Sequence, residues 1–171
     1  EQKTTSKSPR STVGTITELY DYIRLLYARV GTAYSYISNK KMVSYTDQQI
    51  QKLIFEDYMD CKIMFLAPIV KSRKGHYREL FDSLSRQGFS KVRIDGVVTD
   101  LKQGLKVDRY KTHDIELVVD RFKIKKDENF LKRLNESLVT AMHYGKDVLM
   151  IMDINTDKTR YFSRNLMCST S

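Results

Sequence analysis

Cysteine is scarce in this 171-residue chain, and the two that occur, Cys61 and Cys168, lie far apart and outside any CxxC pair. A secreted, disulfide-stabilised domain would carry more cysteine at closer spacing, so the composition favours a reducing cytoplasm. Tryptophan is absent, but 41% hydrophobic and 11% aromatic residues are enough for a packed core. The longest apolar run, 63–70, is too short to cross a bilayer, so we expect no membrane partner.

The motifs of common enzyme classes are also missing. The chain has no GxxxxGK[ST] phosphate loop, no GxSxG and no HExxH, so it has no primary nucleotide-binding site of its own. Glu116 and Asp120 share one expected strand, but an acid–base pair would need a pocket and shifted pKa values. His76, His113 and His143 are interpreted as solvated or capping residues, because each lacks ligand or triad company. We expect no catalytic residue and no bound metal.

Positive charge is abundant instead. The formal net charge is +9 and the isoelectric point is near 9.5. Such a balance favours an acidic partner, which can be nucleic acid, anionic lipid or an acidic protein surface. The charge alone selects none of the three.

Two cap signals predict the first helices. Thr15 and Glu18 form a capping box ahead of a helix over 16–30, whose apolar residues recur at the spacing of one buried face. Thr46 and Gln49 repeat the signal before a short helix that ends near Tyr58. The polar segment 32–44 between them is expected to be a connection or an edge strand.

From Lys62 onward, the pattern predicts a strand, a helix, two strands, a strand, a helix and two strands. The ranges are 62–70, 77–84, 89–95, 97–101, 114–124, 130–141, 147–152 and 159–163. Pro68 is expected at the frayed end of the first strand, because it cannot donate to a ladder. This order predicts an α+β fold in which helices pack on one face of a mostly antiparallel sheet, preceded by an N-terminal arm and helix.

Basic residues alternate with apolar ones in the expected strand 89–95. Strict alternation places Lys91 and Arg93 on the face of Phe89, opposite Val92 and Ile94. Phe89 is then the one aromatic side chain available on that face for stacking a base.

The expected strand 114–124 repeats the alternation. Arg121 and Lys123 share a face with Leu117 and Val119. If the two strands are neighbours, the sheet has a basic patch edged by apolar side chains. Such a patch serves solubility, binds nucleic-acid phosphates, or docks a protein through arginine beside apolar groups.

An ordered set of short segments resembles one family, UvrA, the damage-recognition ATPase of bacterial nucleotide excision repair. The set comprises Glu-Gln-Lys-Thr at 1–4, Pro-Arg-Ser-Thr-Val-Gly-Thr at 9–15, Leu-Ala-Pro-Ile-Val at 66–70, Arg-Lys-Gly at 73–75, Val-Arg-Ile-Asp-Gly at 92–96, Val-Val-Asp-Arg-Phe at 118–122 and Tyr-Phe-Ser at 161–163. No single segment is decisive, but together they cover essentially the whole chain. The resemblance implies a piece of a larger, cytoplasmic DNA-repair ATPase of the SOS response.

The resemblance also implies the function of each part. Residues 1–31 correspond to the Q-loop arm and helix of the parent ATP-binding domain, 32–163 to the UvrB-binding domain, and 164–171 to the start of a zinc module. Lys91 and Arg121 fall where the family presents basic side chains to UvrB, with Arg93 and Lys123 beside them. Gln2 resembles the glutamine that senses the nucleotide-bound magnesium. ATP, magnesium, damaged double-stranded DNA and homodimerisation are expected of the parent protein, and no cofactor or catalysis of this fragment alone.

The chain departs from the family at the zinc module. Residues 31–36 contain no cysteine, and Cys168 is followed by Ser171 where a second cysteine is expected. Four soft ligands cannot be assembled, which argues against a structural zinc. The alternative function that the residues leave open is a nucleic-acid-binding module that uses the same basic sheet face.

Overall fold

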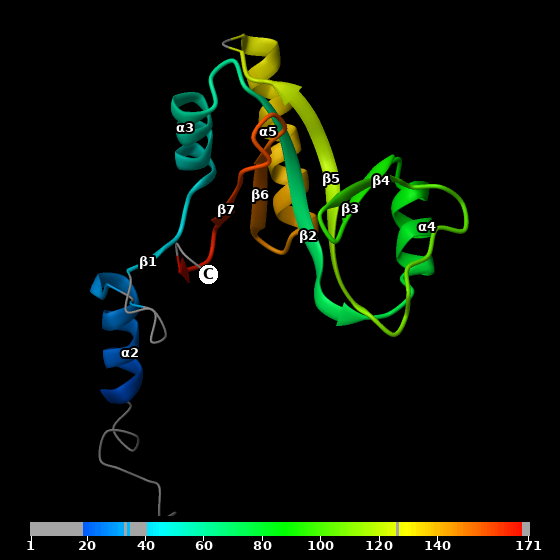
Figure 1. The fold of residues 1–171 in the computed structure, drawn as a ribbon. Coiled ribbons are helices and arrows are strands. Elements are labelled where there is room, and N and C mark those ends of the chain that lie inside the picture. Colours follow the sequence, from blue (N-terminus) through cyan, green and yellow to red (C-terminus); the bar gives the residue numbers. More distant parts are fainter. Residues whose placement is uncertain (1–18, 33, 35–40, 126, 169–171) are drawn as a thin grey trace, which may run out of the picture.

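A computed structural model describes residues 19–32, 34, 41–125 and 127–168 (Figure 1). Its helices are α2 (Leu19–Val30), α3 (Asp47–Asp57), α4 (Arg78–Arg86) and α5 (Glu128–Tyr144). Its strands are β1 (Met42–Val43), β2 (Lys62–Lys74), β3 (Lys91–Ile94), β4 (Val97–Asp100), β5 (Thr112–Lys123), β6 (Val148–Asp153), β7 (Thr159–Ser163) and β8 (Met167–Cys168). The predicted order from Lys62 onward is confirmed.

Six of the strands form one sheet in the order β4-β3-β5-β2-β6-β7, and every neighbouring pair is antiparallel. The long strands β2 and β5 lie at its centre. The short strands β1 and β8 form a separate antiparallel pair, in which Met42 lies opposite Cys168. No pattern in the sequence predicts β8, because two residues are too few to establish a period.

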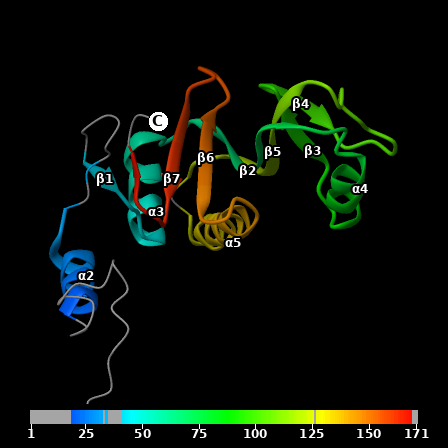
Figure 2. The same cartoon turned by 90° about the horizontal axis from the view of Figure 1, so that it is seen from below.

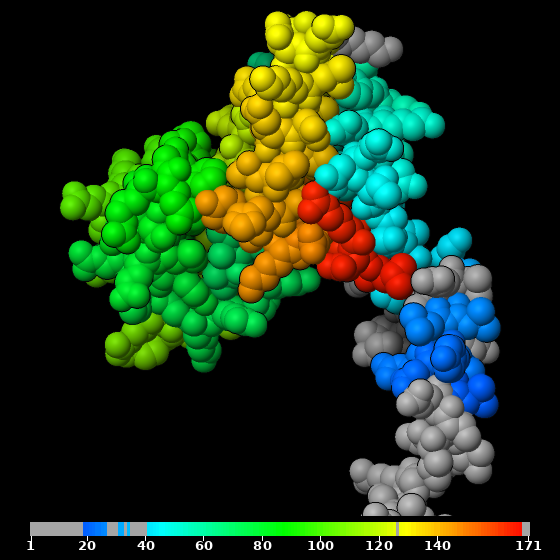
Figure 3. All heavy atoms as spheres, turned by 180° about the vertical axis from the view of Figure 1, so that it is seen from behind, coloured from blue at the N-terminus to red at the C-terminus, as the bar shows by residue number. Residues whose placement is uncertain are grey.

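Three helices cover one face of the six-stranded sheet (Figure 2). Viewed from that side, α5 lies between α3 and α4 (Figure 3). Beneath α3 and α5, the largest buried side chains are Phe65, Phe122 and Phe162. Beneath α4, Phe81 and Leu84 pack on the other half of the same face. The α+β architecture with helices on one face is therefore confirmed.

Local cap chemistry sets the start of α3. Thr46 accepts a hydrogen bond from the backbone N–H of Gln49, and the Gln49 side chain accepts one from the backbone N–H of Thr46. This reciprocal pair satisfies two N–H groups that a helix start leaves without partners, and it confirms the predicted capping box. The other predicted box, Thr15 with Glu18, lies outside the described residues.

The central strand is longer than predicted. β2 continues beyond Pro68 to Lys74, so the expectation of a frayed end at Pro68 is wrong. A register shift between Pro68 and Val70 accommodates the proline, which faces Glu116 of β5. A bulge of this kind tolerates a residue without an N–H donor, so the strand resumes after it.

The first helix differs from its prediction in burial. The apolar residues on α2 were expected to form a buried face, but their described side chains are exposed, from 41% for Ile23 to 60% for Leu26. No cluster of buried residues among the described parts of the chain includes a residue of α2. None of the described helices has both the length and the apolar character that crossing a membrane requires.

Gly145 ends α5 at a point where the backbone passes very close. A Cβ atom at this position would lie 1.9 Å from the carbonyl oxygen of Val148 and 3.1 Å from Cδ of Pro68. We expect Gly145→Ala to lower the free energy of unfolding by about 3 kcal/mol, the upper end of typical overpacking costs, measured by urea denaturation. Gly88→Ala is the control: nothing lies within 4 Å there and only its φ of +93° is unfavourable. A loss at Gly145 no larger than the loss of about 1 kcal/mol expected at Gly88 would contradict the close contact.

A buried histidine fixes the turn between β3 and β4 to the start of β5. The turn residues Asp95 and Gly96 have φ values of 49° and 88°, which suits the Asp-Gly hairpin that the sequence predicts. Nδ1 of His113 lies 2.6 Å from a carboxylate oxygen of Asp95, and Nε2 lies 2.8 Å from the carbonyl oxygen of Asp108. The expectation that His113 is solvated or capping is wrong, since its side chain is only 7% exposed.

The protonation of His113 follows from these partners. Both are acceptors, so only the imidazolium form donates to both. The hydrogen bond to Asp95, followed by that to the Asp108 carbonyl, raises the pKa of His113 above its ordinary value. A raised pKa in the folded state stabilises the fold below the unfolded pKa, and this contribution is lost as the pH rises through the folded pKa.

We therefore expect His113→Gln to remove part of the pH dependence of stability. The wild type should have a higher free energy of unfolding than the variant, and this difference should be larger at about pH 5.5 than at about pH 8.5. Urea denaturation at both pH values measures it. His143→Gln is the control, because His143 is exposed. Equal pH dependence in wild type and His113→Gln would show that His113 does not titrate as described.

Candidate functional site

None of the described helices covers the other face of the six-stranded sheet, and we call it the open face. Its floor is apolar and rich in methionine, with Val98 and Ile154 packed against it. The buried residues of this floor are Met64, Leu66, Val118, Met150 and Met152. They alternate along β2 and β6 with the residues that face the helices, as a two-residue period requires. Methionine adapts its shape easily, and surfaces that receive other proteins use it often.

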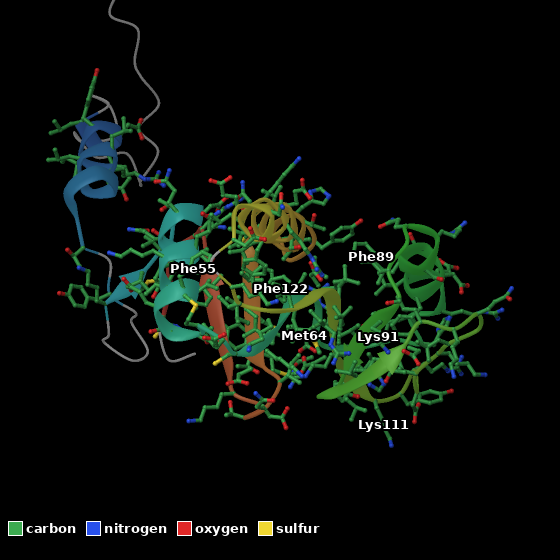
Figure 4. All side chains as sticks on the ribbon, turned by 90° about the horizontal axis from the view of Figure 1, so that it is seen from above. Phe55, Met64, Phe89, Lys91, Lys111 and Phe122 are labelled. Atoms are coloured by element: carbon green, nitrogen blue, oxygen red, sulfur yellow. The ribbon has the colours of Figure 1, made fainter. Side chains whose placement is uncertain are left out.

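The basic residues of β3 lie on this open face. Val92 packs in the cluster beneath α4, so Lys91 and Arg93 point the other way. Figure 4 shows Lys91 on the same side of the sheet as Met64, away from α5. Phe89 does not share their face as predicted: it precedes β3 and packs edge-on against Tyr144, with ring centroids 5.1 Å apart. The aromatic expected to stack a base is therefore turned away.

A bulge in β5 brings the second basic pair to the same face. Phe65 lies opposite Asp120 but Leu66 lies opposite Val118, so Val119 is an extra residue. The extra residue reverses the alternation beyond it. Arg121 and Lys123 consequently lie on the open face, opposite to Leu117, and not on the same face as Leu117 as predicted.

The four predicted binding residues therefore share one face, but they differ in their partners. Lys91 pairs with Asp100 across the β3–β4 ladder, and Lys123 lies 3.3 Å from Asp60. Arg121 is exposed and makes no side-chain ion pair among the described residues. With Lys62, Lys123 and Ile154 it lines a shallow hollow of about 250 Å³. Arg121 is thus the cation of this face best placed to meet a carboxylate of a partner.

Arg93 and Glu116 form a pair that is largely shielded from water. Nη1 of Arg93 lies 3.6 Å from Oε2 of Glu116, and the side chains are only 19% and 10% exposed. Among the residues that the structure describes, neither Nε of Arg93 nor Oε2 of Glu116 has a hydrogen-bond partner. Burial raises the pKa of Glu116, against the opposing effect of Arg93. This pair is long and incompletely satisfied, and it is more buried than the ion pairs of Lys91 and Lys123 on the same face.

Asp120 holds the strand in place next to Arg121, a role the sequence did not reveal. It lies on the helix side, where it accepts hydrogen bonds from Arg133 at 2.6 Å and 2.9 Å and from Ser137 at 2.8 Å. It also accepts one from the backbone N–H of Arg121 at 2.7 Å. Burial raises the pKa of Asp120, but these hydrogen bonds outweigh it and hold that pKa below its ordinary value. The ionised carboxylate thus joins α5 to the bulge that orients Arg121.

The geometry offers no acid–base pair in this part of the chain. Glu116 points to the open face and Asp120 to the helix side, so the two carboxylates of β5 do not face each other. Within the described residues, no group of three or more His, Cys, Asp or Glu side chains is arranged to hold a metal ion. Gln2, the residue predicted to sense nucleotide, lies outside the described residues.

Helices on one face of the sheet, and exposed cations beside a methionine-rich floor on the other, are compatible with a protein-interaction domain. Residues 46–155 match the family model of the UvrA interaction domain, and the chain belongs to this family.

Full-length relatives agree with this assignment. UvrABC system protein A of Methanothermobacter thermautotrophicus is 41% identical over 169 residues, and that of Neisseria gonorrhoeae is 41% identical over 168 residues. UvrABC system protein A of Thermus thermophilus is 38% identical over 170 residues. Each alignment covers 98% of this chain but only 18% of the relative. The chain therefore spans less than a fifth of the length of these relatives, and the resemblance to UvrA seen in the sequence is confirmed.

Proposed function

We propose that this chain is the UvrB-binding domain of a UvrA-type nucleotide-excision-repair protein, and that its open face receives UvrB. The observation that carries the proposal is the gathering of Lys91, Arg93, Arg121 and Lys123 on the sheet face that no helix of the described chain covers. Family membership supports it independently.

The chemistry of the open face defines what UvrB would bring. Arg121 fits a carboxylate, because a guanidinium binds carboxylates through two parallel hydrogen bonds. The methionine floor is at most 7% exposed, so UvrB would place apolar side chains on it only after the side chains that cover it move aside. Arginine next to apolar groups is the composition found at the centres of interfaces. Lys91 and Lys123 already have partners at their own positions, so they would act from the rim and steer the approach.

The remaining assignments concern the longer protein. We propose that the parent protein is an ATPase component of the excinuclease, a homodimer that binds ATP, magnesium and damaged double-stranded DNA in the cytoplasm. Within it, residues 1–31 would belong to the ATP-binding domain, with Gln2 near the nucleotide, and residues 164–171 would begin the degenerate zinc module. The exposure of Leu19, Tyr20 and Leu26 on α2 supports this boundary, since a parent domain would cover them.

The isolated chain is proposed to bind no cofactor and to catalyse no reaction. It lacks a phosphate-binding loop, and a nucleotide-sensing glutamine alone does not bind the phosphates of a nucleotide.

Capture of purified UvrB by the immobilised 171-residue chain tests the proposed function. We expect binding at about 50 mM salt that weakens, but persists, at about 500 mM, because the apolar floor is insensitive to screening. No capture at either salt concentration would contradict UvrB binding. The alternative function, a basic face for nucleic acid, predicts instead that Lys91→Glu with Arg121→Glu loses DNA binding and keeps UvrB binding.

A further inference from the structure

A second cationic surface lies at the far end of the sheet, and we call it the basic tip. It consists of the end of β2, residues 71–74, and the connection 102–111 that leads into β5. In Figure 1, the last part of this connection, where it leads into β5, lies beside the end of β2. Together they carry seven exposed cations and one carboxylate, Asp108. The cations are Lys71, Arg73, Lys74, Lys102, Lys106, Arg109 and Lys111.

Several contacts hold the two segments together. Arg73 lies opposite His113 and Lys74 opposite Thr112 in the β2–β5 ladder. The backbone N–H of Val107 donates to the carbonyl oxygen of His76 at 3.2 Å. The bond between His113 and the carbonyl of Asp108 ties the connection to β5. These contacts fix the backbone positions of the two segments that carry the cations.

The cations of the basic tip outnumber the carboxylates near them, although Lys91 and, from the tip, Lys102 lie close enough to Asp100 to lower the pKa of that carboxyl. Among the described residues, none of the seven makes a side-chain ion pair. The carboxylates next to them accept hydrogen bonds from neutral backbone groups: Asp114 from the N–H of Ser72 at 2.6 Å, and Asp108 from that of Tyr110 at 3.0 Å. On the open face, by contrast, Lys91, Arg93 and Lys123 all have acidic partners. Such an excess of like charge raises the electrostatic energy of the folded chain and favours an external polyanion.

We propose that the basic tip binds the phosphate backbone of nucleic acid, at a site separate from the face that receives UvrB. Residues 71–74 span about 10 Å of strand, about three times the 3.4 Å spacing of charges along one DNA strand. Tyr110 is 69% exposed, so it offers an aromatic surface to a base or sugar. The guanidinium carbon of Arg109 lies 4.6 Å from the centroid of the Tyr110 ring.

Nucleic acid fits the basic tip better than an acidic protein does. The tip segments have no counterpart to the apolar floor of the open face. None of their described residues is among the buried residues of the three hydrophobic clusters. Protein interfaces rely on such a buried centre, whereas phosphate contacts need only dispersed cations. The site would add contacts that position the domain on DNA without reading its sequence.

Fluorescence anisotropy with labelled 30-mer DNA, duplex and single-stranded, tests this proposal on the 171-residue chain. The tip variant is Lys74→Glu with Lys106→Glu and Lys111→Glu; Figure 4 shows Lys111 beyond Lys91, farther from α5. The control variant, Lys52→Glu with Lys125→Glu and Lys132→Glu, has the same net charge and changes exposed residues elsewhere. A third variant with glutamine at the three tip positions guards against misfolding caused by the reversed charges.

We expect the tip variant to bind DNA at least about tenfold more weakly than wild type at low salt, with a flatter salt dependence. The slope of log affinity against log salt should fall by about 2 to 3, close to one for each phosphate that the variant no longer neutralises. The control variant should change affinity less than about threefold. Equal losses of affinity in the tip and control variants would show that net charge alone causes the effect and would contradict a site at the basic tip. No DNA binding by the wild type would refute the site.

Capture of UvrB separates this site from the proposed function. The tip variant should capture UvrB like wild type, because its substitutions leave the open face unchanged. If the tip variant lost UvrB and kept DNA, the basic tip would be a protein contact and the proposal would be wrong. A failure of Arg121 variants to affect UvrB would refute the open-face assignment and leave the basic tip intact.

Discussion

Reversing two charges, Lys91→Glu with Arg121→Glu, is expected to abolish detectable binding of UvrB while the fold survives. Arg121 makes no side-chain ion pair among the described residues, so its reversal breaks no internal ion pair. Removing one partner of a buried charge-assisted contact typically costs about 2–5 kcal/mol, which is roughly 30- to 4000-fold in Kd. Isothermal titration with purified UvrB measures the change in affinity.

The single reversals should differ. Lys91→Glu removes a cation that Asp100 already neutralises and places two carboxylates opposite each other, so part of its effect is a small loss of stability. Arg121→Glu should therefore weaken UvrB binding more than Lys91→Glu. Lys52→Glu with Lys132→Glu, on helices of the covered face, is the matched control and should bind like wild type. UvrB binding that survives the double reversal, with DNA binding abolished instead, would favour the phosphate-binding alternative for this face.

The largest loss of stability is expected for Phe65→Ala. Phe65 is fully buried in the central strand and packs edge-on against Phe122, with ring centroids 4.9 Å apart. Truncating a buried phenylalanine costs about 3–5 kcal/mol, a large part of the roughly 5–15 kcal/mol that holds a typical domain. Denaturant titration followed by circular dichroism gives the difference.

Phe89→Ala is the control for this prediction, because Phe89 lies on the same, helix-covered side of the sheet. Phe89 is only partly buried and contacts Tyr144 near the end of α5, so its truncation should cost clearly less. If Phe65→Ala and Phe89→Ala destabilised the chain equally, β2 would not be the centre of the core.

Features with a local cause were predictable from the sequence. The capping box of Thr46 and Gln49, the Asp95–Gly96 turn and the end of α5 at Gly145 each depend on a few neighbouring residues, and all three are present. The order of strands and helices followed from apolar periodicity for the same reason.

Features with a tertiary cause were not predictable. The bulge at Val119 is set by how β2 and β5 pair, and it alone decides which side of the sheet Arg121 occupies. His113 looks isolated in the sequence, because Asp95 and the carbonyl of Asp108 reach it only after the hairpin folds. The four basic residues share one face of the sheet, while their apolar neighbours, Phe89 and Leu117, were assigned to the wrong face. Whether the four bind a partner stays a prediction.

The central claim is that UvrB covers the open face, and methionine methyl NMR tests it most directly. Met64, Met150 and Met152 lie in the floor of the open face, and Met142 belongs to α5 and packs on the opposite side of the sheet. With the methionine methyl groups labelled, addition of UvrB should shift or broaden the three floor signals and leave Met142 unchanged. A response of Met142 with the three floor signals unmoved would place UvrB on the helix side and contradict the account.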